Sequence, residues 1–181
     1  MKKQNKVITW IAGMIGIVVL VILDQYTKLL AVTHLKDQPD IPILTDIFEL
    51  SYVENRGAAF GMLQNKQLLF VILTLVVMVV LMDIYRRMPD TKRYLPCRIT
   101  ILFLEAGAIG NLVDRVSQGY VVDFFYFKLI DFPVFNVADI YVTVSVFVLA
   151  ILLLFFYKEE ELDQILFHKE NDFDKKSKVG K

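Results

Sequence analysis

Three aspartates lie where long apolar segments of this sequence end: Asp114, Asp123 and Asp139. Ionisable side chains are costly to hold at the edge of a hydrocarbon layer, so a chain that keeps them there is expected to use them. When two carboxyl groups are held close together, one retains its proton while the other stays charged. Such a pair can activate a water molecule and protonate a leaving amine, which is the chemistry of aspartic peptidases. On sequence grounds, Asp114 and Asp123 are both candidates to pair with Asp139.

Other polar residues accompany these aspartates on the apolar segments. Asp24 and Lys28 are four residues apart, so they share one helix face with the acid on the N-terminal side, the favourable order for a pair. An ion pair exposed at the membrane surface explains this spacing equally well. Asn136, Asp139 and Thr143 follow one another at i, i+3 and i+7. This polar stripe is expected to face the other helices rather than lipid.

The elements that must position these residues are membrane-spanning helices. Of the 181 residues, 56% are hydrophobic, which exceeds the apolar share of typical soluble domains. Lysines precede the first apolar segment, as in a secretory signal peptide, but its length and the lack of a cleavage motif favour a retained helix. The predicted fold class is therefore an all-α membrane protein. Residues 1–157 are expected to form one domain with four transmembrane helices, at about 7–31, 67–85, 96–114 and 134–157.

Two loops on one side of the membrane are predicted to carry polar motifs. In the first, residues 32–66, the segment 47–54 alternates apolar and polar side chains as a half-buried strand does. We therefore expect a small extracytoplasmic β-containing region over the outer face. Residues 55–61 then combine small side chains with an amide, which suits either a close approach of the backbone to a ligand or a simple hairpin turn. The second loop, residues 115–133, is rich in aromatic side chains, as is typical of the membrane–water interface.

The distribution of Lys and Arg predicts the orientation of the chain. Five of these residues lie between positions 86 and 98, which marks a cytoplasmic loop under the positive-inside rule. Three more precede residue 7 and six follow Tyr157, so that six are left for the outer side. Both termini are therefore predicted to be cytoplasmic. Residues 158–181 are expected to form a polar cytoplasmic tail that is partly disordered, with a short amphipathic helix at about 162–167.

Composition argues against two other classes of function. The formal net charge is zero and no basic tract is interleaved with aromatic residues, so nucleic acid is not the expected partner. The single cysteine, Cys97, and the two histidines, His34 and His168, do not have the spacing of zinc ligands. We therefore expect no metal site and no cofactor.

Five short motifs follow one another along the chain: D-Q-x-T-K at Asp24 to Lys28, N-R-G-A-A-F at Asn55 to Phe60, G-A-x-G-N-x-x-D-R at Gly107 to Arg115, V-V-D-F at Val121 to Phe124, and F-N-x-A-D at Phe135 to Asp139. In this order they resemble the family of lipoprotein signal peptidases, also called signal peptidase II. The resemblance covers roughly residues 22–143. It departs from the family pattern at Ala106, where the family often has a second glycine, and this departure affects only local helix packing.

The resemblance implies an integral-membrane aspartic peptidase of the bacterial cytoplasmic (inner) membrane, with its active site near the outer face. It implies that Asp123 and Asp139 meet as the catalytic pair. The implied substrate is a prolipoprotein whose lipobox cysteine carries diacylglycerol, cut immediately before that cysteine to release the signal peptide. We expect a monomer whose other partner is membrane lipid. The residues implied to bind substrate or support the pair are Asp24, Lys28, Asn55, Gly57, Gly107, Asn111, Asp114, Arg115 and Asn136.

Two other functions fit parts of the sequence. Intramembrane acids also mark ion pathways, so a small proton- or cation-coupled transporter is the main alternative. The acids of a transporter are expected near mid-membrane on broken or repeated helices, whereas Glu105 is the only deep acid here and no internal repeat is visible. A lipid-binding or assembly subunit, whose polar belt only anchors four helices, is the third interpretation.

Overall fold

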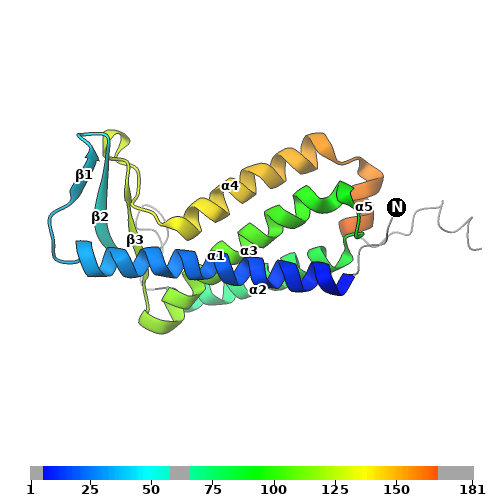
Figure 1. Cartoon of the computed structure of the whole chain (residues 1–181), viewed down its shortest axis with the longest axis horizontal. Coiled ribbons are helices and arrows are strands. Elements are labelled where there is room, and N and C mark those ends of the chain that lie inside the picture. The colour runs from blue at the N-terminus through cyan, green and yellow to red at the C-terminus, as the bar shows by residue number, and fades with distance from the viewer. Residues whose placement is uncertain (1–5, 58–65, 167–181) are drawn as a thin grey trace, which may run out of the picture.

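The computed structural model describes residues 6–57 and 66–166, which form a helical bundle with a small sheet across one end (Figure 1). Within this part of the chain, four helices are long and apolar enough to cross a membrane. The predicted fold class, four transmembrane helices with a small β-containing region, is thereby confirmed. The helices of the bundle are α1 (Lys6–Leu35), α2 (Gln67–Arg87), α3 (Leu95–Gln118) and α4 (Val137–Ile151), the last continued by a π-helical turn over Leu152–Phe156.

Local sequence explains where α3 ends and where α4 begins. α3 continues beyond its predicted end to Gln118, and Gly119 then closes it in the left-handed conformation (φ 77°) that favours glycine. α4 begins at Val137, later than predicted, because Asn136 caps it. The Asn136 side chain accepts a hydrogen bond from the Asp139 backbone N–H (3.0 Å), and the Asp139 side chain accepts one from the Asn136 N–H (3.2 Å). This reciprocal capping places an aspartate in the first turn of α4.

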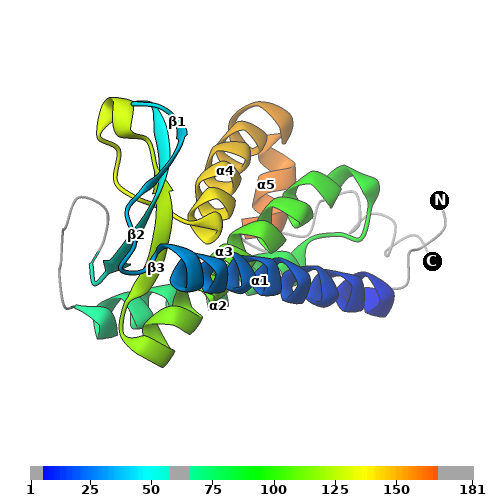
Figure 2. The same ribbon diagram turned by 60° about the vertical axis from the view of Figure 1, so that its left-hand side comes forward.

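The sheet has three antiparallel strands in the order β1 (Ile41–Leu44), β2 (Phe48–Asn55) and β3 (Val121–Tyr126), and a 3-10 turn, η3 (Lys128–Ile130), follows β3. β2 covers the segment predicted as a strand, whereas sequence patterns place β3 in an aromatic loop. They miss this strand because its first four residues are all buried, so it lacks the alternation of a half-buried strand. Pairing of β2 with β3 sets Val53 opposite Asp123. The strand β3 lies beside the ends of α1 and α3 (Figure 2).

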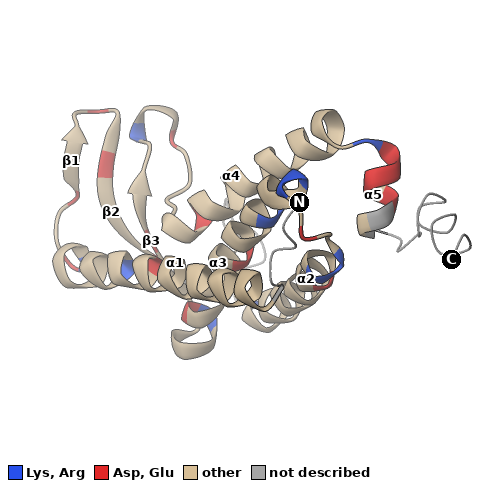
Figure 3. Ribbon diagram, turned by 45° about the vertical axis from the view of Figure 1, so that its right-hand side comes forward, with Lys and Arg blue, Asp and Glu red and all other residues tan. Residues whose placement is uncertain are grey.

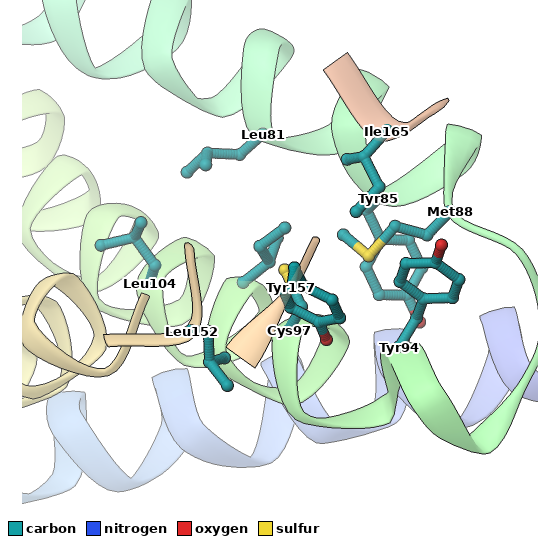
Figure 4. Packing of buried hydrophobic residues seen from close by; sticks show 10 residues of the cluster. Leu81, Tyr85, Met88, Tyr94, Cys97, Leu104, Leu152, Tyr157 and Ile165 are labelled. Atoms are coloured by element: carbon teal, nitrogen blue, oxygen red, sulfur yellow. The ribbon is translucent and has the colours of Figure 1, made fainter. Parts of the chain in front are cut away.

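Two hydrophobic clusters hold these elements together. The larger cluster lies at the end of the bundle away from the sheet, where side chains of α2, α3 and the turn after α4 meet (Figure 4). The smaller one joins α1 to the sheet, where Ala31 and Leu35 cluster with Val122 and Phe124 of β3. β3 is therefore packed against the bundle as well as paired with β2, which fixes its position over the ends of the helices.

The predicted tail begins with a helix, α5 (Glu159–Leu166). It is amphipathic, because Ile165 is buried in the larger cluster while Glu161 forms an ion pair (3.0 Å) with Arg93 in the 3-10 turn before α3 (η2, Lys92–Tyr94). Charged residues gather near this end of the bundle, around α5 and the end of α2, and the middle stretches of the long helices are almost free of them (Figure 3). The rest of the predicted tail, residues 167–181, lies outside the described residues.

Candidate active site

Asp123 and Asp139 lie on different elements and line the same cavity. Asp123 is on β3 and is almost completely buried, and Asp139 is in the first turn of α4. The cavity has a volume of about 410 Å³ and lies where the sheet meets α4. The other residues that line it are Asn55, Gly57, Arg115, Phe132, Pro133, Val134, Phe135, Ile140, Thr143 and Val144. One polar corner with two carboxyl groups therefore faces a mainly apolar wall.

A single asparagine connects the two carboxyl groups. Asn136 is fully buried, and its Nδ2 donates to Asp123 Oδ1 (2.6 Å). Its backbone N–H donates to Asp139 Oδ2 (3.2 Å). Because the N-cap of α4 fixes both the backbone and the side chain of Asn136, Asp123 and Asp139 are held in a fixed relation to each other.

The second oxygen of each carboxyl group accepts a hydrogen bond from a further asparagine. Asn55 Nδ2 donates to Asp123 Oδ2 (2.8 Å), and Asn111 Nδ2 donates to Asp139 Oδ1 (2.7 Å). The orientation of both amides is fixed because each amide oxygen accepts a hydrogen bond of its own. Asn55 Oδ1 accepts from the Gly57 N–H (3.0 Å), and Asn111 Oδ1 accepts from the Lys28 ammonium. Amides thus occupy one lone pair on every carboxyl oxygen, so a proton or a water molecule must use those that remain.

The surroundings of the two carboxyl groups differ. Burial removes Asp123 from water and raises its pKa to about 7, and the negative charge of Asp139 contributes to the same rise. Hydrogen bonds from Asn55 and Asn136 lower the pKa of Asp123 but do not cancel this effect. Asp139 lies at the N-terminus of α4, where the helix dipole favours a negative charge. The arrangement can therefore hold one proton on Asp123 while Asp139 is charged.

A buried ion cluster lies behind Asn111. The Lys28 ammonium contacts Asp24 Oδ2 (2.9 Å), Asp114 Oδ2 (3.0 Å) and Asn111 Oδ1 (2.9 Å), which uses all three of its donors. The side chains of Lys28 and Asp24 are 4% and 0% exposed, so the alternative of an exposed surface pair is wrong. Removal of one partner from a buried ion pair typically costs about 3–5 kcal/mol. Lys28 thus ties α1 to α3 and, through Asn111, to Asp139.

The two aspartates of this cluster also hold backbone groups. Asp114 Oδ2 accepts a hydrogen bond from the Val122 N–H (3.2 Å), which ties the start of β3 to α3. Asp114 is not among the residues that line the cavity, so Asp123 is the aspartate that meets the α4 carboxyl group there. Asp24 Oδ1 accepts from the Ala138 N–H (2.9 Å) and so holds the first turn of α4.

Two glycines of α3 allow the helices to approach this closely. A Cβ at Gly107 would lie 2.6 Å from the Ala138 carbonyl oxygen, and one at Gly110 would lie 2.5 Å from Asp24 Oδ2. Both distances are shorter than the contacts that Cβ atoms make in proteins, so a larger side chain would push α4 or Asp24 away. Gly107 therefore affects the site through backbone packing and not through a polar contact.

Comparison with known families agrees with this geometry. The family described as signal peptidase (SPase) II matches residues 16–155. The chain belongs to the signal peptidase II family. The lipoprotein signal peptidase of Caldanaerobacter subterraneus subsp. tengcongensis is 48% identical over 137 residues, which cover 75% of this chain and 91% of the relative. That of Clostridioides difficile (strain 630) is 44% identical over 140 residues, which cover 77% of this chain and 93% of the relative.

The fold is also found among solved structures. A bacterial membrane enzyme solved by the in meso method at 1.9 Å resolution superposes with a TM-score of 0.70. It is 33% identical to this chain, and the match covers 81% of this chain and 94% of that one. The resemblance of the motifs to signal peptidase II is confirmed by the family match and by the relatives.

The signal peptidase II motifs fall into distinct places around the cavity. Asn55, Gly57 and Arg115 line it together with the two carboxyl groups, and residues 58–60 of the second motif lie outside the described residues. The Arg115 guanidinium lies over the Phe70 ring (5.0 Å), and its Nε has no hydrogen-bond partner among the described residues. The predicted residues that support the site from behind the cavity are Asp24, Lys28, Gly107, Asn111, Asp114 and Asn136.

Gln25 is a site residue that the analysis of spacing leaves out. Its Nε2 lies 2.9 Å from Asp114 Oδ1, 3.1 Å from the Gly110 carbonyl oxygen and 3.2 Å from Asp24 Oδ2, and its two hydrogens are shared among these three acceptors. It therefore holds α1 against α3 beside the Lys28 ammonium. The sequence feature that indicates its role is a polar amide on an otherwise apolar helix. Such an amide is expected to face other helices, because its N–H groups would be unpaired in lipid.

Glu105, the deep acid considered for ion transport, is buried in α3 and does not line the cavity. Its Oε1 has no hydrogen-bond partner in the described part of the chain. Residues 6–57 and 66–166 contain no group of three or more His, Cys, Asp or Glu side chains that could hold a metal ion. The transporter alternative has no support in the family match or in the relatives named above.

Proposed function

We propose that this chain is a membrane-embedded aspartic endopeptidase that removes the signal peptide from diacylglyceryl-modified prolipoproteins. One observation carries the aspartic mechanism: Asp123 and Asp139 line one cavity and are joined by Asn136. The relatives are lipoprotein signal peptidases, and that name supplies the substrate class. Their similarity covers about three quarters of the chain, and the family match over residues 16–155 includes β3 and the first turn of α4, which carry the pair.

Asp139 is the general base in this mechanism. Its charge is favoured by the N-terminus of α4 and by the Asn111 amide, and it takes a proton from a water molecule in the cavity. The water oxygen then adds to the carbonyl carbon of the scissile peptide bond. Asp123 donates its proton to the carbonyl oxygen at the same time, so the intermediate is a neutral diol and the pair has exchanged its protonation states.

Collapse of the diol restores both carboxyl groups. Asp139 gives its new proton to the amide nitrogen, the C–N bond breaks, and Asp123 takes a proton from one diol hydroxyl. The products are a carboxylic acid and an amine, and the site is again ready with one proton on Asp123. Cleavage immediately before the lipobox cysteine makes the lipid-modified cysteine the leaving amine.

The geometry of the bundle supports a substrate that is itself held in the bilayer. The site lies at the end of helices that are long enough to span the membrane, which is the level at which the end of a membrane-inserted signal peptide lies. The apolar wall of the cavity, which includes Phe132, Phe135 and Ile140, suits lipid chains and small apolar side chains.

We also propose that the enzyme works as a monomer at the outer face of the bacterial cytoplasmic membrane, with both termini in the cytoplasm. The excess of Lys and Arg between positions 86 and 98 and near the chain ends supports this orientation. A single chain supplies both carboxyl groups of the pair and the asparagines that hold them, and this supports a monomer.

The experiment is cleavage of a diacylglyceryl prolipoprotein by purified, folded variants. Asp123→Asn and Asp139→Asn are each expected to lower turnover by about 10²–10⁴-fold, because each removes a proton-transfer step. Asp114→Asn, which does not line the cavity, is expected to act mainly by lowering folded abundance. If folded Asp123→Asn cleaves within about tenfold of the parent, a difference of about 1.4 kcal/mol in the barrier, then Asp123 is not one of the pair.

A further inference from the structure

A second hollow adjoins the active-site cavity along the seam between α3 and α4. Its volume is about 390 Å³. Ile140 and Val144 of α4 line both hollows, so the second continues from the first toward the far end of the bundle. The other residues that line it, which together with these two form what we call the α3–α4 groove, are Ile99, Thr100, Phe103, Tyr141, Ser145 and Val148.

The groove is suited to an apolar occupant. Ile99 and Val148 on its opposite walls are 46% and 38% exposed, so apolar surface is available to a partner. Thr100 Oγ1 donates to the Pro96 carbonyl oxygen (2.9 Å), so this hydroxyl is already satisfied within α3. Thr100 and Ser145 are both small and buried, and small residues of this kind let a further helix approach closely within a membrane.

The length and direction of the groove match one part of the proposed substrate. From Asp139 to Val148 the α4 helix rises by roughly 13 Å at 1.5 Å per residue. The apolar region of a signal peptide has about 7–15 residues, which as a helix spans roughly 10–22 Å. The cut is made at the C-terminal end of the signal peptide, so its apolar region must extend from the active site into the bilayer, which is the course of the groove.

We propose that the α3–α4 groove binds the apolar segment of the substrate's signal peptide as a helix, directly adjoining the cleavage site. This inference rests on the proposed function, because it takes the occupant from a prolipoprotein. The acyl chains of the same substrate are the competing occupant. The small, buried floor at Thr100 and Ser145 favours a helix over acyl chains, which need no close approach of backbones.

The first test compares two substrates with the full-length enzyme. One is a diacylglyceryl prolipoprotein with its complete signal peptide, and the other is a diacylglyceryl peptide that has the cleavage site but no apolar segment. Val148→Trp fills the far end of the groove. Val146→Trp is the matched control, because Val146 is also exposed on α4 (52%) but does not line the groove.

We expect Val148→Trp to lower the ratio of kcat/KM for the long substrate to that for the short one by about tenfold or more, through KM. Val146→Trp is expected to leave this ratio at the parent value. A fall of kcat/KM for both substrates alike in Val148→Trp would assign the groove to the acyl chains, which both substrates carry, and would overturn the proposal. An unchanged ratio in both variants would overturn it as well.

The second test does not depend on cleavage. A photoreactive phenylalanine analogue is placed at Val148 or at Val146 in the Asp139→Asn variant, and the uncut prolipoprotein is added. The proposal requires crosslinks to the signal peptide from position 148 and not from position 146, together with the expected kinetic ratio. A parent enzyme that cleaves neither substrate refutes the proposed function itself, whereas a parent that cleaves both while position 148 gives no crosslink refutes only the groove assignment.

Discussion

Gly107 is the position that best tests how closely α3 and α4 must pack to hold the aspartate pair. A Cβ at this position would lie 2.6 Å from the Ala138 carbonyl oxygen and 2.8 Å from Val142 Cγ2. The Val142 methyl group can move by rotation of its side chain, but the carbonyl belongs to the backbone of α4. In Gly107→Ala the two helices must therefore separate by about 0.8 Å to reach 3.4 Å, where ordinary van der Waals contact begins.

Two effects of opposite sign act on the stability of Gly107→Ala. Alanine is favoured over glycine in a helix interior by about 1 kcal/mol. Overpacking of a well-packed contact costs about 1–3 kcal/mol, so the net loss is expected to lie between zero and about 2 kcal/mol. The effect on turnover is larger, because Ala138 directly precedes Asp139. A misplacement approaching 1 Å can cost about 10²-fold in rate, so kcat is expected to fall by about 10- to 100-fold.

Gly16→Ala is the matched control, because a Cβ at Gly16 in α1 meets nothing within 4 Å. It is expected to retain full activity and to be more stable than the parent by up to about 1 kcal/mol. The assay is cleavage of a diacylglyceryl peptide at saturating concentration by purified enzyme, with the melting temperature of each variant measured in the same detergent. If Gly107→Ala retains kcat within about twofold of the parent, packing at this crossing does not position the pair.

Two further predictions concern protonation and orientation. Burial raises the pKa of Asp123 to about 7, and Asp123 acts in its protonated form. We therefore expect kcat/KM to fall as the pH rises through about 7. A profile that stays flat to about pH 9 would contradict the role of Asp123 as the acid. Between its ordinary pKa of 3.8 and about 7, Asp123 keeps its proton in the folded state and loses it in the unfolded state, so part of the stability should be lost as the pH rises from about 4 to about 7. Asp123→Asn should lose less stability than the parent over this range, because the amide that replaces the carboxyl group does not titrate. The orientation of the chain in the membrane can be tested with single cysteines. Cys97 is only 2% exposed and makes a poor probe, so it is replaced by alanine. In this background, Lys92→Cys and Lys128→Cys place one cysteine at an exposed position near each end of the molecule. A membrane-impermeant maleimide should label Lys128→Cys in intact cells and Lys92→Cys only after permeabilisation, and the reverse pattern would invert the proposed topology.

Hydropathy and the order of the motifs are enough to predict the spanning helices, the strand β2 and the family. The four spanning helices are recognisable because each must present a long apolar surface to lipid, which is a local property of composition and length. β2 is recognisable because apolar and polar residue types alternate along the segment 47–54 of the sequence. The five motifs also contain the residues proposed for the site, because the chemistry of a family leaves the same residue types at the same spacings.

The choice between Asp114 and Asp123 depends on contacts that are distant in sequence. Asp123 is held by Asn55, which is 68 residues away, once β3 pairs with β2. Because β3 is buried at its start, its sequence has no alternation that would reveal the strand. Asp114 is turned instead toward Lys28 on α1, and its spacing gives no sign of that partner.

The burial of Asp24 and Lys28 and the identity of their partners likewise depend on the tertiary structure. The spacing of Asp24 and Lys28 shows that they share a helix face, but it is equally compatible with an exposed pair. Lys28 is buried because α3 brings Asn111, 83 residues away, to its ammonium group. Local sequence encodes periodicity and hydrophobicity, whereas desolvation and the pKa of a carboxyl group depend on which distant segments exclude water from it and which donors they supply.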